Sequence, residues 1–495
     1  MDRVHLTRMC EALQESLDRA RSEAWGDRPG DSPGEADQGP VGCPVAAAID
    51  RSLTSLRADL DGHRIDREAA RVRLRRLVAL AGAVRSGDLA QSPASDPTRP
   101  IVDADPWDYR RDRHRDGDRW ERQWIERIAG STSLGSNPHG STSFGLGLAQ
   151  PEMAQPDLAP RDVAPRDPID PCRPAPLRRA LLTSCGMAAM TTVLALVERS
   201  TGDGPIVVDR ATYHETRHLL ATGALARRVH EVATDDVADA ITTLGATAVV
   251  VDAVSNSADV RLVDLDRISH ALDQVTGGPA PLLLVDASVC STAAGPVRRL
   301  LTRSGPTHRT VVIESLTKHA QLGLDRVAAG VIVADDGDAT LLDGLREHLG
   351  TNIADLTCLQ LLPPDPTLLD ARLRRIDRNA GLVAERLAAV GVPVVHPSRA
   401  DHPDHTRWLA DRPSCGLLTL PLEAGPPDLL DRWRERALDQ EVPLDHGAGF
   451  GFDTTRVYRT SATVPQARCF VRIAPGTEPI DTMVAVAEVL ASPWT

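Results

Sequence analysis

The stretch Ile313-Glu314-Ser315-Leu316-Thr317-Lys318-His319 contains the only lysine of the chain, and the fold and the chemistry can be worked out from it. Arginine stays protonated, whereas a lysine amine can lose its proton and form an imine with a carbonyl group. Lys318 also follows an apolar run at residues 310–313, which predicts a buried strand. We therefore interpret Lys318 as a Schiff-base residue rather than as a chance surface charge in an arginine-rich sequence.

The composition limits the classes of protein to which the chain can belong. Its 495 residues are 42% apolar, enough for two or three globular domains. A net charge of −13 argues against nucleic-acid and membrane partners, and no apolar run approaches the roughly 20 residues that span a bilayer. The N-terminal residues lack the apolar core of a signal peptide. The eight cysteines have neither metal-ligand spacing nor the density of a disulfide scaffold, so we expect a cytoplasmic protein without a metal.

The chain divides into four segments by composition and periodicity. Residues 1–128 alternate helical patterns with connectors rich in Gly, Pro and Asp, which predicts a helical N-terminal extension that serves packing, assembly or partner binding. Residues 129–180 are rich in Ser, Gly, Pro and Asp, which predicts an extended linker. Residues 181–375 alternate strands with helices, and residues 376–495 are expected to form a smaller α+β C-terminal domain.

Six apolar runs predict strands, at residues 205–208, 228–232, 248–251, 281–285, 310–313 and 327–333. They are nearly continuous runs of apolar residues, as expected where helices cover both faces of a sheet. We predict an α/β fold, with a three-layer large domain built on a mainly parallel sheet. In such a sheet the ligand binds beyond the carboxyl ends of the strands.

Polar and charged residues follow several of these runs. Asp286 ends one predicted strand, Asn256 follows another, and Gly186 begins a predicted helix whose free N–H groups suit a phosphate. Each alone has an ordinary alternative, such as a helix cap, a turn, packing or a surface ion pair. The other candidates are Met187, Tyr213, Ser315, Thr317 and Arg472. With Lys318 they supply a phosphate cradle, an aromatic ring, a carboxylate and an arginine, which is what binding of pyridoxal 5'-phosphate (PLP) requires.

These candidates lie in motifs that resemble the Cys/Met-metabolism family of PLP-dependent enzymes, which includes cystathionine γ-synthase, cystathionine γ-lyase and methionine γ-lyase. The matching motifs, in the family's order, are Ser184-Cys185-Gly186-Met187-Ala188-Ala189, Val251-Asp252-Ala253-Val254-Ser255-Asn256, Val285-Asp286-Ala287-Ser288, Ser315-Leu316-Thr317-Lys318-His319 and Val471-Arg472-Ile473-Ala474-Pro475-Gly476-Thr477-Glu478. The resemblance covers residues 130–491. It implies fold type I of the PLP-dependent transferases, with PLP as the cofactor.

The resemblance also implies roles around the cofactor ring. Lys318 would carry the cofactor as a Schiff base and later move protons, and with Tyr213 it is a candidate catalytic residue. Asp286 would keep the pyridine nitrogen protonated. Tyr213 would stack on the ring and assist proton transfer, and Asn256 would donate to the phenolic oxygen of the ring.

The remaining implied roles concern the two anionic groups in the site. Gly186, Met187, Ser315 and Thr317 would hold the phosphate. Arg472 would pair with the α-carboxylate of an amino-acid substrate through a bidentate contact.

The N-terminal part of the resemblance departs from the family pattern. Family members carry a Tyr and an Arg that reach the phosphate site of the neighbouring subunit, and Thr132 and Leu134 occupy these positions here, although Asn137 and Pro138 match. The arginines at residues 110–111 are one candidate for supplying the missing charge. Because the family shares sites across subunits, the resemblance implies a homo-oligomer, either a dimer or a tetramer.

For the function, the resemblance implies a PLP-dependent lyase or transferase of amino-acid metabolism. It would act on an amino acid with a side-chain leaving group, by γ-elimination or γ-replacement through a vinylglycine-type intermediate. The departures indicate a divergent member with an unusual substrate, as in specialised metabolism. β-Elimination by a C–S lyase and transamination use the same core residues and stay open. A non-catalytic assembly or regulatory role also stays open because the Tyr and Arg are missing, although Asp286 and Lys318 argue against it.

Overall fold

The computed structural model of the chain describes its C-terminal two thirds almost completely and parts of the N-terminal third. The described residues are 7, 10, 11, 13, 14, 44–62, 64, 70, 74, 77, 115–129 and 178–494, with gaps at 304, 324–326, 355–356, 359–360, 362–363, 413, 422–427 and 461–468. Nearly all of the predicted linker lies outside these residues, as do Thr132, Leu134, Asn137, Pro138 and the arginines at 110–111.

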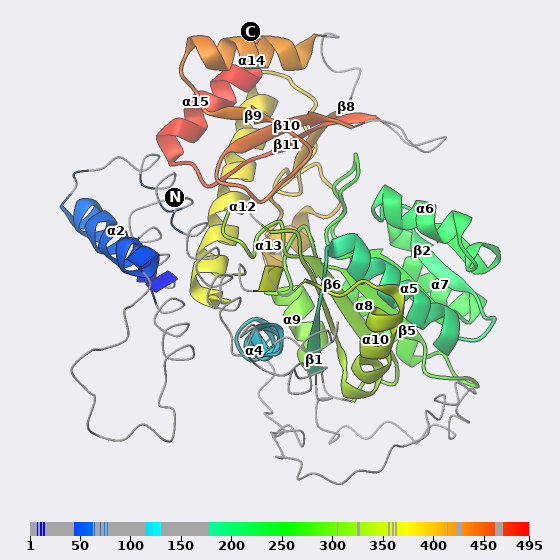
Figure 1. Cartoon of the computed structure of the whole chain (residues 1–495). Helices are drawn as coiled ribbons and strands as arrows, with labels where there is room; N and C mark the ends of the chain where they lie inside the picture. Colours follow the sequence, from blue (N-terminus) through cyan, green and yellow to red (C-terminus); the bar gives the residue numbers. More distant parts are fainter. Residues whose placement is uncertain are drawn as a thin grey trace, which may run out of the picture.

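A seven-stranded sheet forms the centre of the large domain (Figure 1). Its strands are β1 (Arg178–Thr183), β2 (Ile206–Asp209), β3 (Val229–Val232), β4 (Ala248–Asp252), β5 (Leu282–Asp286), β6 (Arg309–Ser315) and β7 (Gly330–Asp335). Their order in the sheet is β1-β7-β6-β5-β4-β2-β3. Strands β2 to β6 pair in parallel, and β7 runs antiparallel to both of its neighbours, β1 and β6. The predicted mainly parallel sheet is therefore confirmed.

Helices cover both faces of this sheet, as the continuous apolar strands predict. They are α5 (Gly186–Ser200), α6 (His214–Thr222), α7 (Val237–Leu244), α8 (Leu265–Asp273), α9 (Gly295–Thr302) and α10 (Asp336–Leu349). Alternate residues of a strand point to opposite faces. Val249 and Val251 accordingly pack into a core shared with α7, α8 and α9, whereas Val250 packs into a second core with α5 and α10. This arrangement confirms the three-layer α/β architecture.

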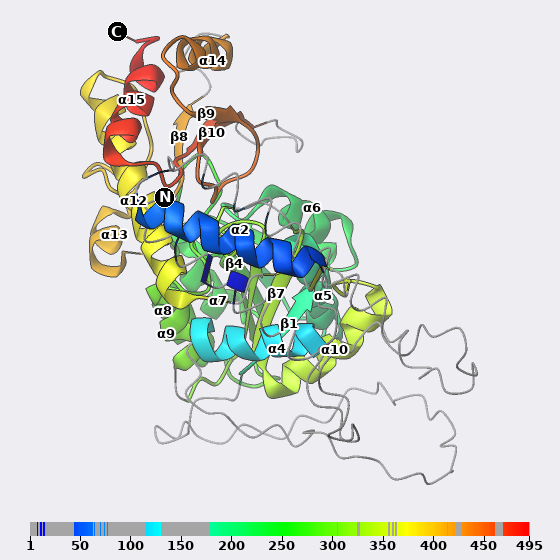
Figure 2. The same cartoon turned by 60° about the vertical axis from the view of Figure 1, so that its left-hand side comes forward.

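The edge strand β1 is the main difference from the predicted elements, because no strand is predicted before residue 205. The strand is short and begins with two arginines, so its sequence lacks a continuous apolar run. Pairing with β7 along its whole length makes it a strand. Helix α4 (Arg115–Trp124) from the N-terminal extension lies beside β1 (Figure 2). The carboxylate of Glu121 accepts a hydrogen bond of 2.6 Å from the Leu182 N–H, so the extension covers part of this sheet edge.

The two tryptophans of α4 tie the extension into the core of the large domain. Trp120 and Trp124 stack with ring centroids 4.8 Å apart, and both are buried in the core that also contains Val249. The π-helix Ile125–Ala129 continues α4. Another described element of the extension is the helix α2 (Pro44–Asp61), which agrees with the helical pattern of the first 128 residues.

A second sheet of four strands forms the smaller C-terminal domain. Its strands are β8 (Leu418–Pro421), β9 (Leu444–His446), β10 (Thr455–Arg459) and β11 (Phe470–Ala474), in the order β8-β11-β10-β9. The helices of this part are α12 (Pro366–Ala389), α13 (His405–Asp411), α14 (Leu429–Asp439) and α15 (Ile480–Ala491). Because α12 runs through the predicted boundary between residues 375 and 376, the four-segment division stays a proposal.

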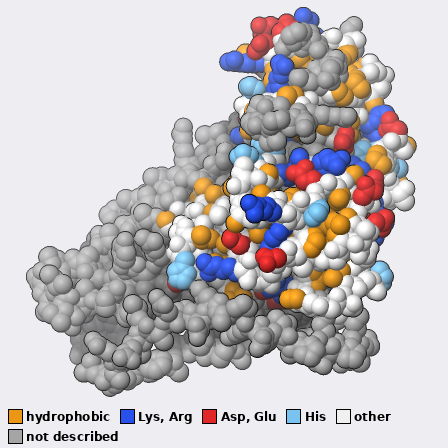
Figure 3. Space-filling view, turned by 90° about the vertical axis from the view of Figure 1, so that its right-hand side faces the viewer, with side chains coloured by type: hydrophobic (Ala, Val, Ile, Leu, Met, Phe, Trp, Pro, Cys, Tyr) orange, Lys and Arg blue, Asp and Glu red, His pale blue; other side chains and the backbone are white. Residues whose placement is uncertain are grey.

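The described part of the chain has a mixed surface on one face (Figure 3) and no helix suited to a membrane. On the face in Figure 3, basic, acidic and apolar side chains lie interspersed. Among the described helices, none has the length and apolar character that crossing a membrane demands.

A buried ion pair joins α12 to the loop before β10, and its loss is expected to destabilise the fold. Arg372 and Asp453 are both nearly inaccessible to solvent, and Asp453 also accepts a hydrogen bond of 2.9 Å from the Thr477 hydroxyl. We expect Asp453→Ala to lower the free energy of unfolding by about 3–5 kcal/mol, because Arg372 is left charged without its acid. Denaturant titration measures this loss.

The exposed pair of Asp370 with Arg374, one turn apart on the same helix, is the matched control. Asp370→Ala should cost less than about 1 kcal/mol, because water screens an exposed pair. Equal losses in the two variants would contradict the assignment of a structural role to the buried pair.

Candidate active site

A cavity of about 910 Å³ opens beyond the carboxyl ends of β2, β4, β5 and β6. This is the edge at which a parallel sheet binds its ligand. The predicted site residues that line the cavity are Gly186, Met187, Tyr213, Asn256, Asp286, Ser315, Lys318 and Arg472. Thr317 does not line it. The structure thus brings together, around one cavity, residues that lie as far as 286 positions apart, between Gly186 and Arg472.

Lys318 lies in the turn that follows β6. Its backbone N–H donates to the Ser315 carbonyl over 3.3 Å, which directs the chain out of the strand. Its Nζ lies 4.8 Å from the centroid of the Phe450 ring, a distance at which an ammonium group is attracted to an aromatic face. Gly451 has a φ of 78°, and a Cβ atom there would lie 2.9 Å from the Lys318 carbonyl carbon. The glycine therefore allows the C-terminal domain to pack directly on Lys318.

Asp286 is the last residue of β5. Its Oδ1 accepts a hydrogen bond of 2.8 Å from the Ser288 N–H, and the Ser288 hydroxyl accepts one of 2.8 Å from the Ser315 N–H. Burial raises the pKa of Asp286, although Ser288 and the charge of Lys318 act in the opposite direction. A cationic group next to Asp286 would therefore stabilise its carboxylate form. Ser288, a residue without a predicted role, joins the ends of β5 and β6.

The N-terminus of α5 lies against the end of β6. A Cβ atom on Gly186 would come within 2.8 Å of the Ser315 Cβ, so only glycine permits this approach. Cys185 caps the helix, its Sγ accepting from the Ala188 N–H at 3.3 Å. The Ser315 hydroxyl bonds that of Thr317 over 2.8 Å. The helix N-terminus and the Ser315 hydroxyl suit a phosphate, whereas Thr317 contacts Ser315 and does not line the cavity.

Arg472 reaches the cavity from β11. The residue is 5% exposed, and its guanidinium donates to the Asn256 Oδ1 over 2.9 Å and to the Ala448 carbonyl. Because the Asn256 oxygen is taken, its NH₂ group is the donor left for a ligand. Burial lowers the pKa of Arg472 to about 10, although Tyr213 and Tyr458 act in the opposite direction. Arg472 therefore stays charged at neutral pH.

Tyr213 precedes α6, and its backbone N–H donates to Asp252 over 3.1 Å. Burial, together with Glu215, raises the pKa of its phenol, so the phenol keeps its proton at neutral pH. Burial and the neighbouring Asp286 also raise the pKa of Asp252. The family that the motifs resemble carries a Glu at this position.

Three aromatic residues of the C-terminal domain complete the cavity, and the sequence analysis missed them. The whole chain has only four Phe and three Tyr. Four of these seven line this one cavity, namely Tyr213, Phe450, Tyr458 and Phe470. The Arg472 guanidinium lies 5.4 Å from the Phe450 centroid and 5.7 Å from the Tyr458 centroid. The scarcity of Phe and Tyr in the rest of the chain was the signal that could have found them.

Glu314 is a fully buried acid beneath the site, and it gives the fold a pH dependence. It accepts hydrogen bonds from the Thr292 N–H at 2.7 Å and the Ser291 hydroxyl at 3.1 Å. Burial raises its pKa from 4.5 to about 7, so the folded chain holds a proton that the unfolded chain releases. Stability from this group is therefore complete below pH 4.5 and is lost as the pH rises towards 7, by about 3 kcal/mol in total.

Glu314→Gln keeps the shape of the side chain and removes its titration. We expect the stability of this variant relative to the wild type to rise between pH 4.5 and pH 7, as measured by urea unfolding. Glu385→Gln, at an exposed position of α12, is the matched control. A constant difference between Glu314→Gln and the wild type across this range would show that Glu314 ionises normally.

Comparison with known proteins shows where the chain belongs. The sequence profile of the Cys/Met metabolism PLP-dependent enzymes matches residues 176–434. The bifunctional enzyme flvA of Aspergillus flavus is 25% identical over 329 residues, which cover 63% of this chain and 39% of the relative. An L-methionine gamma-lyase of Brevibacterium sandarakinum is 32% identical over 246 residues, which cover 49% of this chain and 58% of the relative. The chain thus spans roughly half the length of these curated relatives.

Solved structures give the same fold. A cystathionine gamma synthase from Xanthomonas oryzae pv. oryzae, crystallised with aminoacrylate and cysteine, superposes with a TM-score of 0.53 at 20% identity. The superposition covers 64% of this chain and 81% of that chain. At this identity the likeness establishes the fold, which confirms the predicted fold type I.

The family profile matches more than half of the chain. The matched region runs from just before β1 into α14 and contains all the predicted site residues except Arg472. Both the motif order and the profile lead to one conclusion: this chain belongs to the Cys/Met metabolism family of PLP-dependent enzymes.

Proposed function

We propose that this chain is an enzyme that uses PLP to eliminate or replace the γ-substituent of an amino acid. The observation that carries the proposal is the position of Lys318, the only lysine, in one cavity with Asp286 and Arg472. The relatives named methionine gamma-lyase and cystathionine gamma synthase support the γ-carbon as the site of reaction.

The described residues fit PLP at both ends of the cofactor. Gly186 has no side chain where it approaches Ser315. The backbone N–H groups at the start of α5 and the Ser315 hydroxyl are therefore available to the phosphate. Asp286 has a raised pKa, and a protonated ring nitrogen would restore its carboxylate form. When bound, PLP supplies an aldehyde that captures amines and a ring that withdraws electrons from the α-carbon of the substrate.

The chain's own residues can then bind the substrate and move its protons. Arg472 binds the α-carboxylate through its fork of N–H groups, and Asn256 fixes the orientation of that fork. The Lys318 amine would accept the proton of the α-carbon. The phenol of Tyr213 keeps its proton at neutral pH and can donate it to the departing group.

Product analysis in deuterated water tests the proposal. L-methionine and O-acylated L-homoserines are incubated with the holoenzyme, and the position of deuterium in the products is read by NMR. γ-Chemistry removes a proton from Cβ, so we expect label at Cβ. Products without label at Cβ would contradict γ-chemistry, a keto acid that keeps its γ-substituent would establish transamination, and an absence of product from every amino acid would favour the non-catalytic alternative.

We also propose a homo-oligomer, a dimer or a tetramer, located in the cytoplasm. Support for the oligomer comes from the resemblance to a family that shares its sites between subunits. Among the described cysteines, Cys185, Cys290, Cys415 and Cys469 are free thiols, as expected in a reducing compartment. Light scattering coupled to gel filtration measures the mass of the particle, and a monomer would contradict the proposal.

A further inference from the structure

The segment that carries Asn256 is irregular and needs support from outside itself. We call residues 253–262, which follow β4, the Asn256 segment. Its two ends pair through an isolated bridge between Val254 and Leu262. Val260, which is fully buried, has a φ of 44°, which a β-branched residue adopts only under constraint from its surroundings.

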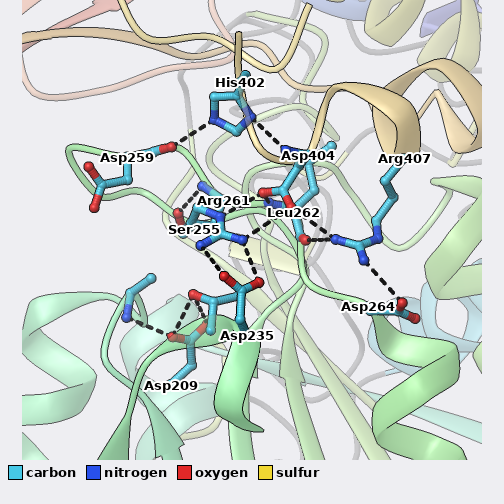
Figure 4. A network of polar contacts seen from close by, with 12 residues as sticks. Asp209, Asp235, Ser255, Asp259, Arg261, Leu262, Asp264, His402, Asp404 and Arg407 are labelled. Atoms are coloured by element: carbon cyan, nitrogen blue, oxygen red, sulfur yellow. Dashed lines mark hydrogen bonds and ion pairs between the residues drawn. The ribbon is translucent and has the colours of Figure 1, made fainter. Parts of the chain in front are cut away.

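The support comes from Asp404, about 140 positions further along the chain (Figure 4). Asp404 is 4% exposed and lies immediately before α13. Its carboxylate accepts hydrogen bonds from the Leu262 N–H at 2.9 Å, from the Arg261 Nε at 2.8 Å and from the Arg407 guanidinium at 3.0 Å. Burial opposes the ionisation of Asp404, but the contacts with Arg261 and Leu262 outweigh it and lower its pKa.

Two further contacts hold the same segment to the C-terminal part of the chain. His402 Nε2 lies 2.9 Å from the Asp259 carbonyl oxygen, and the Thr419 hydroxyl donates to the Ala258 carbonyl over 2.6 Å. His402 is itself fixed, because its Nδ1 accepts from the Asp404 N–H at 3.0 Å. Asp404 therefore holds the Asn256 segment both directly and through His402.

We propose that Asp404 is a positioning residue of the active site, which holds the Asn256 segment so that the Asn256 oxygen meets Arg472. This inference rests on the proposed function, in which Arg472 binds the substrate carboxylate. Arg472 is buried, and a buried guanidinium needs acceptors that fix its orientation. If the segment moves, Arg472 loses one of the two acceptors described above and its fork turns away from the substrate.

The other acid bound to Arg261 is a poorer candidate for this task. Asp235 contacts the Arg261 guanidinium at 2.7 Å, but its side chain is 72% exposed. An exposed ion pair is screened by water and contributes little. The buried carboxylate of Asp404 accepts hydrogen bonds from two guanidinium groups and a backbone N–H. It therefore determines where Arg261 and the Asn256 segment lie.

The test is a double-mutant cycle with Asp404→Asn and Asn256→Ala, measured on the holoenzyme. We expect Asp404→Asn to raise the KM for the amino acid about tenfold, the effect of one lost charged hydrogen bond, with a smaller change in kcat. Because Asp404 acts through Asn256, the double variant should bind the amino acid no worse than Asn256→Ala alone. Asp401→Asn is the matched control, since Asp401 lies nearby but its side chain is 69% exposed and pairs with Arg399 in the same loop.

Three results would overturn the inference. The first is a KM for Asp404→Asn equal to that of the wild type, even with a lower melting temperature. The second is a double variant in which the two losses multiply. If Asp404→Asn does not fold, Arg261→Gln removes the same contact between Arg261 and Asp404. The third result is a KM for Arg261→Gln equal to that of the wild type. Reductive trapping of PLP at Lys318 is run on the wild type and on every variant. If the wild type traps no PLP, the proposed function itself is refuted. If a variant traps PLP and its KM is unchanged, only the role of Asp404 is refuted.

Discussion

Lys318→Ala is expected to lower kcat/KM by about 10³-fold or more, because one side chain supplies both the covalent attachment and the proton acceptor. Phe450 and Gly451 pack on this residue from the C-terminal domain, so its position is fixed. Steady-state kinetics with saturating PLP measures the loss. Excess free PLP separates a catalytic defect from weak cofactor binding.

Lys318→Arg is the informative control for this variant. An arginine keeps the positive charge near Phe450 and Asp286 but cannot form the covalent link. We expect it to be as inactive as Lys318→Ala. If the arginine variant retained a tenth of the wild-type activity, charge rather than nucleophilicity would be the function of Lys318, and the proposed mechanism would be wrong.

Asp286→Asn is expected to lower kcat by at least about 10²-fold, the size of effect seen when one preorganised electrostatic contact is removed. The asparagine keeps the volume and still accepts from the Ser288 N–H, but it has no charge with which to hold a proton on the ring nitrogen. The loss should lie in kcat rather than in the KM for the amino acid, because Arg472 and Asn256 are untouched.

The neighbouring acid Asp252 provides the comparison for Asp286. It ends β4 directly opposite Asp286 and lines the same cavity. Burial and the neighbouring Asp286 raise its pKa well above the ordinary value, which opposes the ionisation of its carboxyl. Asp252→Asn should therefore lose less than about tenfold in kcat. Equal losses in the two variants would mean that the site needs polarity at this edge and not the charge of Asp286.

The residues at the strand ends could be predicted from the sequence for a physical reason. A parallel sheet delivers the carboxyl ends of its strands to one edge, so Asp286, Asn256 and Ser315 had to come near each other once the strands were recognised. The same logic placed Gly186 at that edge. Spacing along the chain does not show which of two neighbouring hydroxyls faces the cavity, so the role of Thr317 stays a prediction.

Contacts between distant parts of the chain could not be predicted in this way. Phe450, Tyr458 and Phe470 come from a second sheet, and nothing in their local sequence shows which cavity that sheet closes. Glu121 of α4 bonds the edge strand β1, and neither element has a periodicity that reveals the other. Both features depend on how the segments dock, which apolar patterning alone does not specify.

Mass spectrometry after borohydride reduction of the holoenzyme tests the central claim most directly. Because Lys318 is the only lysine, a pyridoxyl group trapped on a side-chain amine can be carried by one residue alone. We predict a single pyridoxyl adduct on the peptide that contains Lys318, together with loss of the visible absorbance of the protein. A reduced holoenzyme whose Lys318 peptide carries no adduct would contradict the account.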